Sequence, residues 1–187
     1  DSGPPPRPKL LLTESFLLPQ RGMGILANHS DITISDSVLS GEGVLPDQTD
    51  FGLPTGAATS YGGGLFLLQA TKLVMRRGEI AHFRARYCAG LALNAGSDAD
   101  VEGTIFQNNR ATEAGGGICA WPSAVSVPYA QNAESASGSS ALLAVRLLLR
   151  EVRFASNAAK TGAAVYANLP SSPHAQQYMK ETEVRMQ

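Results

Sequence analysis

Short runs of glycine and alanine, each followed by one apolar residue, recur along this chain. The apolar residues that close these runs are Ile25, Leu65, Leu91, Ile118 and Val165. Between the runs, apolar and polar residues alternate over a few positions at a time, which is typical of half-buried strands. The middle runs lie about 26 residues apart, a spacing that indicates a repeat architecture.

A second repeated feature is a phenylalanine that ends a strand-like stretch. Phe16, Phe83, Phe106 and Phe154 close the stretches TESF, EIAHF, EGTIF and REVRF, and TEVRM carries Met186 in the same place. Each unit therefore contains three short strands: one after the glycines, one in the middle and one that ends at the phenylalanine. This pattern predicts an all-β fold, a right-handed parallel β-helix of about five or six irregular turns.

Successive turns of a β-helix lie about 4.8 Å apart, so equivalent side chains form columns. We expect Phe83, Phe106 and Phe154 to stack as one aromatic column in the core. Asn109 and Asn157 follow at a corner, where a side-chain amide satisfies backbone groups of the loop.

The wider spacings coincide with loop-like insertions at residues 40–61 and 128–141, which are rich in small and polar residues. Residues 1–9 are interpreted as a Pro-rich linker. One β-helix domain then occupies residues 10–187, and we expect it to be part of a longer chain. Residues 173–187 allow either a capping helix or another strand, and the likeness of TEVRM to REVRF favours the strand.

Composition narrows the classes of partner. The 187 residues carry 15 Lys and Arg against 16 Asp and Glu, a formal net charge of −1. This balance gives no basic field for nucleic acid, and no apolar run approaches the roughly 20 residues that cross a bilayer. The histidines are far apart, and the chain carries neither zinc-ligand spacing nor a phosphate loop with its lysine. We therefore expect no cofactor, no nucleic acid and no membrane span.

The sequence alone leaves two covalent modifications undecided, a disulfide and an N-linked glycan. Cys88 and Cys119 either form one disulfide between neighbouring turns or are two small buried hydrophobic residues, and the second interpretation is preferred. Asn28 begins the triplet Asn-His-Ser, an acceptor for N-glycosylation that has meaning only in a secreted eukaryotic protein.

Three carboxylates form a candidate metal site. Asp98, Asp100 and Glu102 match the first half of a calcium loop, but Asn109 stands where such a loop needs a bidentate carboxylate. A solvated turn before the EGTIF strand is the preferred interpretation.

Four arginines form a candidate partner face. Arg76, Arg77, Arg84 and Arg86 lie close together in the sequence and are candidates for binding acidic glycans or a partner protein. Scattered exposed arginines, with some stems packed on neighbours, are the preferred interpretation.

Parallel β-helices also house polysaccharide lyases and hydrolases, so an enzyme is the main alternative function. Glycoside cleavage needs two carboxylates about 5–9.5 Å apart. The best stacked pair is Glu79 with Glu102, and the best local pair is Asp98 with Asp100. The strands after the glycines carry almost no ionisable residues, which favours a protein without catalytic residues.

The pairing of Phe-x-x-Asn with a following Gly-Gly-x-Ile run resembles the repeat of the chlamydial polymorphic outer membrane proteins. The full pair occurs at Phe106–Asn109 with Gly116–Ile118, and a looser copy occurs at Phe154–Asn157 with Gly162–Val165. The resemblance implies a β-helical region at the cell surface or outside the cell, used in adhesion. The expected function is a non-catalytic structural or adhesive module that binds other proteins or surface glycans along its side. A subunit of a larger fibre, built from further copies or from a longer chain, is a third possibility.

Overall fold

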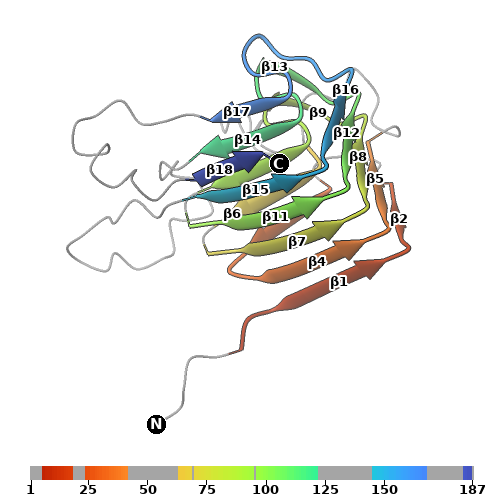
Figure 1. Ribbon diagram of the computed structural model, residues 1–187, viewed down its shortest axis with the longest axis vertical. Coiled ribbons are helices and arrows are strands. Elements are labelled where there is room, and N and C mark those ends of the chain that lie inside the picture. Colours follow the sequence, from red (N-terminus) through yellow and green to blue (C-terminus); the bar gives the residue numbers. More distant parts are fainter. Residues whose placement is uncertain are drawn as a thin grey trace, which may run out of the picture.

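The computed structural model describes residues 6–18, 24–41, 63–68, 70–94, 96–121, 145–167 and 183–186. These residues form parallel β-strands and contain no helix (Figure 1). The protein is therefore all-β over its described part, as the alternating apolar pattern predicts.

The strands form three large sheets and one small sheet. Sheet A contains, in spatial order, β1 (Lys9–Thr13), β4 (Asp31–Ser35), β7 (Lys72–Arg76), β11 (Asp98–Glu102), β15 (Arg146–Arg150) and β18 (Glu183–Met186). Sheet B contains β2 (Phe16–Leu17), β5 (Val38–Ser40), β8 (Glu79–Ala81), β12 (Ile105–Gln107) and β16 (Arg153–Ala155). Sheet C contains β3 (Ile25–Asn28), β6 (Leu65–Leu68), β10 (Leu91–Asn94), β14 (Ile118–Trp121) and β17 (Val165–Ala167), and sheet D pairs β9 (Arg84–Tyr87) with β13 (Arg110–Ala114).

Within every sheet the spatial order of the strands follows the chain order. The chain visits the sheets in the order C, A, B, and in two places it adds a strand of sheet D. We call each such passage a unit, so that unit 3 is β6–β9, unit 4 is β10–β13 and unit 5 is β14–β16. Because each unit lies on the previous one with parallel pairing (Figure 1), the arrangement is compatible with a parallel β-helix.

The glycine and alanine runs set the register that the sequence predicts. Ile25 pairs with Leu65, Leu65 with Leu91, Leu91 with Ile118, and Ile118 with Val165. The small residues just before these positions bring backbones into close contact, and a Cβ on Gly64 would lie 2.6 Å from the Gly90 carbonyl oxygen. Residues without a side chain are needed at such approaches.

The predicted three-membered aromatic column is wrong in one member. Phe106 pairs in register with Phe154, and their rings stack with centroids 5.4 Å apart. The partner of Phe106 in unit 3 is Ile80, not Phe83. Because Arg84 pairs with Arg110, Phe83 aligns instead with Asn109. It is buried there, and its ring lies beside Gly41 and Gly64.

Two other predicted alignments also differ. Met186 lies in β18 of sheet A, in register with Leu149, and so does not take the phenylalanine place in sheet B. Phe16 pairs with Val38, one position before the column, and is 64% exposed. The expected strand near the end of the chain is present as β18.

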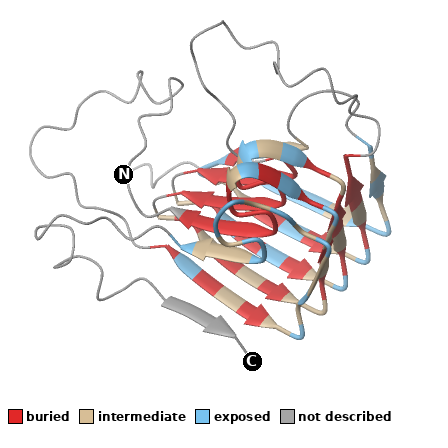
Figure 2. Cartoon of the chain, turned by 90° about the horizontal axis from the view of Figure 1, so that it is seen from above, coloured by how far each residue is buried: buried red, intermediate tan, exposed pale blue. Residues whose placement is uncertain are grey.

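The core lies between the inner faces of sheets A, B and C. The inner strands of sheet A alternate between buried and outward residues, so that Leu73 and Met75 of β7 are buried while Lys72 and Val74 point outward. The strands β6 and β10 of sheet C are buried on both sides (Figure 2), with Phe66, Leu68, Ala92, Cys88 and Cys119 in a second apolar cluster. Sheet A is therefore the large face on which outward side chains meet solvent.

The corner between sheets A and B is built from one residue per unit with positive φ. These residues are Glu14, Asp36, Arg77, Gly103 and Glu151, with φ between 46° and 58°. Each follows the last residue of a sheet A strand, and backbone hydrogen bonds link the corners, as from Arg77 N to Glu102 O at 2.9 Å. Since only glycine adopts this conformation without strain, Gly103 is the relaxed member of the column.

Two of the predicted boundaries meet described strands. Ser40 ends β5 and Lys9 begins β1, so the first predicted insertion and the linker each overlap a strand by one residue. Most of insertion 40–61 and all of insertion 128–141 lie outside the described residues. The segment 173–182, where the alternative capping helix would begin, also lies outside them.

Candidate functional site

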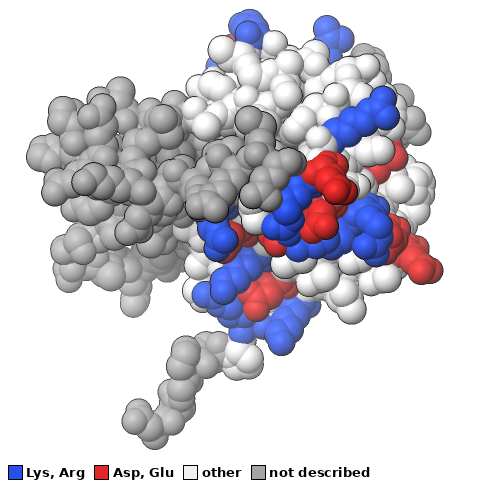
Figure 3. All heavy atoms as spheres, in the orientation of Figure 1, with Lys and Arg blue, Asp and Glu red and all other residues white. Residues whose placement is uncertain are grey.

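Charged side chains gather on the outer face of sheet A (Figure 3). One row across the sheet consists of residues paired in register whose charges alternate in sign: Lys9, Asp31, Lys72, Asp98 and Arg146. Opposite charges directly across parallel strands stabilise the pairing, and like charges oppose it. The alternation therefore stabilises this register.

The centre of this face is a cluster of two arginines and two carboxylates. Asp100 Oδ2 lies 2.7 Å from Arg76 Nη2, and Asp100 Oδ1 lies 2.7 Å from Arg150 Nη2. Glu102 Oε2 lies 3.0 Å from Arg150 Nη2 and 3.3 Å from Arg76 Nε. The four side chains are between 25% and 42% exposed, so the cluster is partly screened from water and its charges balance.

This arrangement shifts two pKa values. Partial burial acts to raise the pKa of Asp100, but hydrogen bonds from Arg76 and Arg150 outweigh it, and the pKa lies below the usual aspartate value. Hydrogen bonds to Glu102 and Asp100 raise the pKa of Arg150. Both shifts hold the groups in their charged forms.

The candidate calcium ligands lie on a strand and not in a loop. Asp98, Asp100 and Glu102 occupy alternate positions of β11 and share its outer face, so the predicted turn is wrong. Each carboxylate faces a guanidinium, and for Asp98 the distance to Arg146 Nη1 is 3.8 Å. Among the described residues, no group of three His, Cys, Asp or Glu is placed to hold a metal ion. The alternation of acidic and small apolar residues in Asp-Ala-Asp-Val-Glu is typical of a half-buried strand and indicates β11 from the sequence.

The four candidate arginines do not form one face. Arg76 belongs to the sheet A cluster, and Arg77 at the next corner donates two hydrogen bonds of 2.7 Å to Asp36. These bonds lower the pKa of Asp36. Arg84 and Arg86 lie on β9 of sheet D, where the Arg86 guanidinium is 5.4 Å from the centre of the Tyr87 ring. The backbone turns at Arg77 and again at His82, both with positive φ, and these turns separate the two pairs.

A groove follows the corner between sheets B and D, and sequence reasoning missed it. Its lining residues come from four successive units: Gly41, His82, Arg84, Asn108, Arg110, Ser156 and Ala158, around a hollow of about 380 Å³. We call it the corner groove. Arg110 lies outside the arginine cluster of the sequence, and only the register of β9 with β13 brings it beside Arg84.

The candidate carboxylate pair of Glu79 and Glu102 is not formed. Glu79 lies on β8 in sheet B, in register with Ile105, and hydrogen-bonds Gln107. Glu102 lies on β11 in sheet A, in register with Arg76 and Arg150. The two residues belong to different sheets because Glu79 follows the corner at Arg77 in its unit, whereas Glu102 precedes the corner at Gly103 in the next unit. Asp98 and Asp100 do share one face.

The motif residues pack as one structural unit. Asn109 is fully buried, its Oδ1 accepts from Phe83 N at 3.1 Å, and its Nδ2 donates to Ile80 O at 2.8 Å. The Phe106 ring lies over Gly90, where a Cβ would be 3.1 Å from Cδ1. The asparagines and phenylalanines are thus placed to stabilise stacking, as the corner interpretation predicts.

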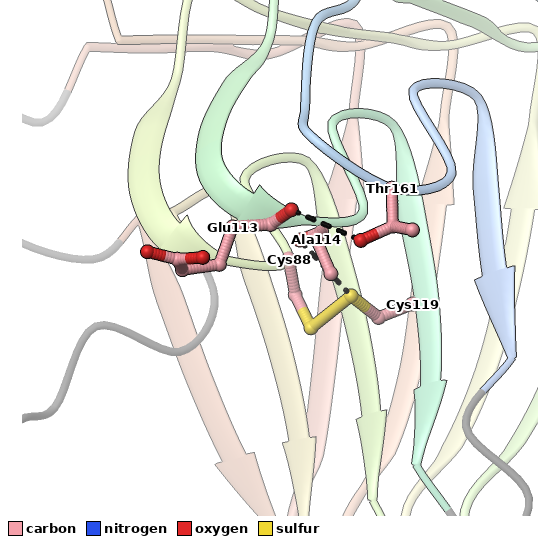
Figure 4. Close-up of a disulfide and its surroundings, with 5 residues drawn as sticks. All are labelled: Cys88, Glu113, Ala114, Cys119 and Thr161. Atoms are coloured by element: carbon pink, nitrogen blue, oxygen red, sulfur yellow. Dashed lines mark hydrogen bonds between the residues drawn. A yellow bond between two sulfur atoms is a disulfide. The ribbon is translucent and has the colours of Figure 1, made fainter.

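Cys88 and Cys119 are joined in a disulfide between neighbouring units (Figure 4). Both are buried, their Cα atoms are 5.1 Å apart, and the carbonyl oxygen of Ala114 lies 3.7 Å from Cys119 Sγ. Gly115 has φ +70°, and a Cβ there would collide with Cys119 Sγ. The glycine is therefore needed for both backbone conformation and space.

The acceptor triplet for glycosylation lies at the end of β3. Asn28 is exposed, His29 has positive φ, and the Ser30 hydroxyl donates to Asn28 O at 2.7 Å. This position faces outward on the edge strand of sheet C.

A family model for the Chlamydia polymorphic membrane protein repeat matches residues 103–120. The matched span contains Phe106 and Asn109 at the end of unit 4 and the run Gly115–Ile118, which leads into β14 of unit 5. The match supports a repeat of the polymorphic membrane protein type and, in general terms, a location at the cell surface. No curated protein and no solved structure matches the chain.

Within the described ranges, none of the elements is a helix with the length and apolar character needed to cross a membrane.

Proposed function

We propose that this chain is a right-handed parallel β-helix and a non-catalytic module of a cell-surface protein, which binds a protein or glycan partner along its side. The observation that carries the proposal is the match of the polymorphic membrane protein repeat to residues 103–120, where β12 pairs in register with strands of both neighbouring units. Stacked units of this kind expose a long lateral surface, which suits extended binding.

The disulfide supports a location outside the cytosol. Disulfides form and persist in oxidising compartments and are rare where thiols are kept reduced. The bond between Cys88 and Cys119 is buried and joins two units of the stack. A structural bond of this type agrees with secretion or surface display.

The state of the carboxylates supports binding over catalysis. Glycoside cleavage needs one carboxyl group with a raised pKa beside a second, free carboxylate. Asp100 has a lowered pKa, and arginines engage both Asp100 and Glu102. Among the described residues, the corner groove is lined by no carboxylate.

One observation favours assembly as a second candidate function. The first unit of the stack exposes large apolar side chains, with Leu11 70% and Phe16 64% exposed. Their strands β1 and β2 are at the edges of sheets A and B. Edge strands of this kind pair with another strand, so this end suits contact with a further β-helical unit or copy.

The test is adhesion measured together with turnover. Beads coated with the folded protein should bind cells of a test panel or a glycan array more than beads coated with protein that was reduced, alkylated and unfolded. The same protein should leave acidic and neutral polysaccharides uncut over hours of incubation. Absence of adhesion in the folded sample would count against binding, and cleavage of any polysaccharide would overturn the non-catalytic assignment.

A further inference from the structure

The corner groove places two arginines side by side. Arg84 and Arg110 are paired in register on β9 and β13, so their Cα atoms are about one strand spacing apart. Both side chains are exposed and line the groove. Their guanidinium groups therefore project from neighbouring units at the same wall.

These two arginines differ from those of sheet A. On sheet A the guanidinium groups of Arg76 and Arg150 contact Asp100 and Glu102. Within the described part of the chain, Arg84 and Arg110 contact no carboxylate. Like charges placed directly across two strands destabilise the pairing. An anion between the two guanidinium groups would remove that cost.

The remaining lining residues indicate the kind of anion. Asn108 and Ser156 supply an amide and a hydroxyl to the groove, and Gly41 and Ala158 leave room beside them. The groove contains no large apolar side chain among these residues, whereas protein partners anchor in sites built for aromatic or aliphatic groups. Guanidinium, amide and hydroxyl donors together suit a ligand that carries oxyanions and hydroxyl groups.

We propose that the corner groove binds the sulfate or carboxylate group of an acidic saccharide between Arg84 and Arg110. The saccharide hydroxyls hydrogen-bond Asn108 and Ser156. This inference rests on the proposed function as a surface module and names its ligand class and its site.

The test is calorimetric titration of the whole chain with four probes: a heparin-derived tetrasaccharide, trigalacturonate, maltotetraose and a tetraglutamate peptide. The heparin tetrasaccharide, trigalacturonate or both should bind, and which of them binds identifies sulfate or carboxylate as the anchoring group. Maltotetraose should not bind. Binding of tetraglutamate alone would overturn the proposal in favour of an acidic protein segment.

Two double variants with the same charge change give the control. Arg84→Gln with Arg110→Gln should weaken saccharide binding at least about tenfold. Lys72→Gln with Arg146→Gln removes two cations that flank Asp98 on sheet A and should leave the affinity within about twofold. An equal loss of saccharide affinity in both double variants would show that only the net charge matters, and this result would overturn the proposed site.

Thermal unfolding without ligand separates a binding role from a structural role. If the two arginines serve a ligand, the Arg84→Gln and Arg110→Gln variant should melt at the wild-type temperature or above, because a repulsive pair is gone. A clear fall in melting temperature would contradict the proposal. Cell adhesion of beads that persists in this variant, alongside lost saccharide binding, would leave the proposed function standing with a different contact surface.

Discussion

The side-chain oxygen of Asn157 accepts a hydrogen bond from the backbone N–H of Asn109 at 3.0 Å. Its Nδ2 donates to the carbonyl oxygen of Phe106 at 2.8 Å. Asn109 makes the same two bonds one unit earlier, to Phe83 and Ile80. Each asparagine therefore satisfies the corner backbone of the preceding unit, and the pair of bonds connects neighbouring units at the end of sheet B.

Replacement of these asparagines should destabilise the stack unequally. Asn109→Ala leaves a buried N–H and a buried carbonyl without partners and should lower the free energy of unfolding by about 2–4 kcal/mol. Asn157→Ala should cost less, because Asn157 is half-buried and water can replace the amide. Urea denaturation measures both, with the exposed Asn28→Ala as control at about 0.5 kcal/mol or less. Equal small losses at all three positions would contradict the corner role.

The disulfide should contribute measurably to stability. Its two cysteines are 31 residues apart in sequence, and closing a loop of that length stabilises a fold by about 2–4 kcal/mol. Cys88→Ala with Cys119→Ala should show this loss in urea, and a reductant should then have no further effect on the variant. A thiol-reactive dye added to the denatured, unreduced wild-type protein should find no free thiol; full labelling would contradict the bond.

Acid should weaken the cluster on sheet A. The pKa of Asp100 is lowered in the folded state, so its contribution to stability is present above the unfolded aspartate pKa of about 3.9. This contribution is lost as the pH falls from there through the folded pKa. Asp100→Asn should therefore reduce stability at pH 7, by about 1 kcal/mol for a partly exposed pair, and the difference from wild type should shrink below about pH 4. Urea midpoints between neutral pH and pH 2.5 give the comparison, and a constant difference across this range would contradict the assignment.

The positive-φ residues at the corner between sheets A and B predict two stability changes of opposite sign. Glu151 has φ +53° and is exposed, so Glu151→Gly relieves a left-handed strain of about 1–2 kcal/mol against a smaller entropy cost. The variant should be more stable by up to about 1 kcal/mol. Gly103 has φ +58°, and the nearest atom to an added Cβ is 3.5 Å away. Gly103→Ala should therefore destabilise by about 1 kcal/mol through conformation alone.

Thermal melting of these two variants together checks the column. If the melting temperatures of both variants shifted in the same direction, side-chain contacts would outweigh the backbone conformation at these corners. Glu14→Gly, at the first member of the column, provides a second relaxed variant for comparison.

Much of the stacking register could be predicted from the glycine and alanine runs. Residues such as Gly64 and Gly117 lie where a side chain would meet the backbone of the next unit, so the requirement is local and leaves a visible trace in the sequence. The phenylalanine pattern was less informative. The core accepts an aliphatic residue in the column, and Ile80 stands where Phe106 and Phe154 stand in later units.

The candidate sites depended on three-dimensional placement more than the stacking register did. Arg76 and Arg84 are near one another in sequence, but corners at Arg77 and His82 send them to different sheets. Arg84 and Arg110 are distant in sequence and become neighbours through the pairing of β9 with β13. No pattern of spacing within one unit contains that information.

The amino-acid sequence alone determined that this protein is a repeated β structure, that small residues mark the start of each unit, and that asparagines serve its corners. Those properties follow from backbone sterics and strand periodicity, which act over a few residues. Only the tertiary structure decided which of two large residues enters the aromatic column, that Cys88 bonds Cys119, and which arginines are neutralised. Each of these depends on contacts between units, where register and the direction of each corner set the distance between side chains.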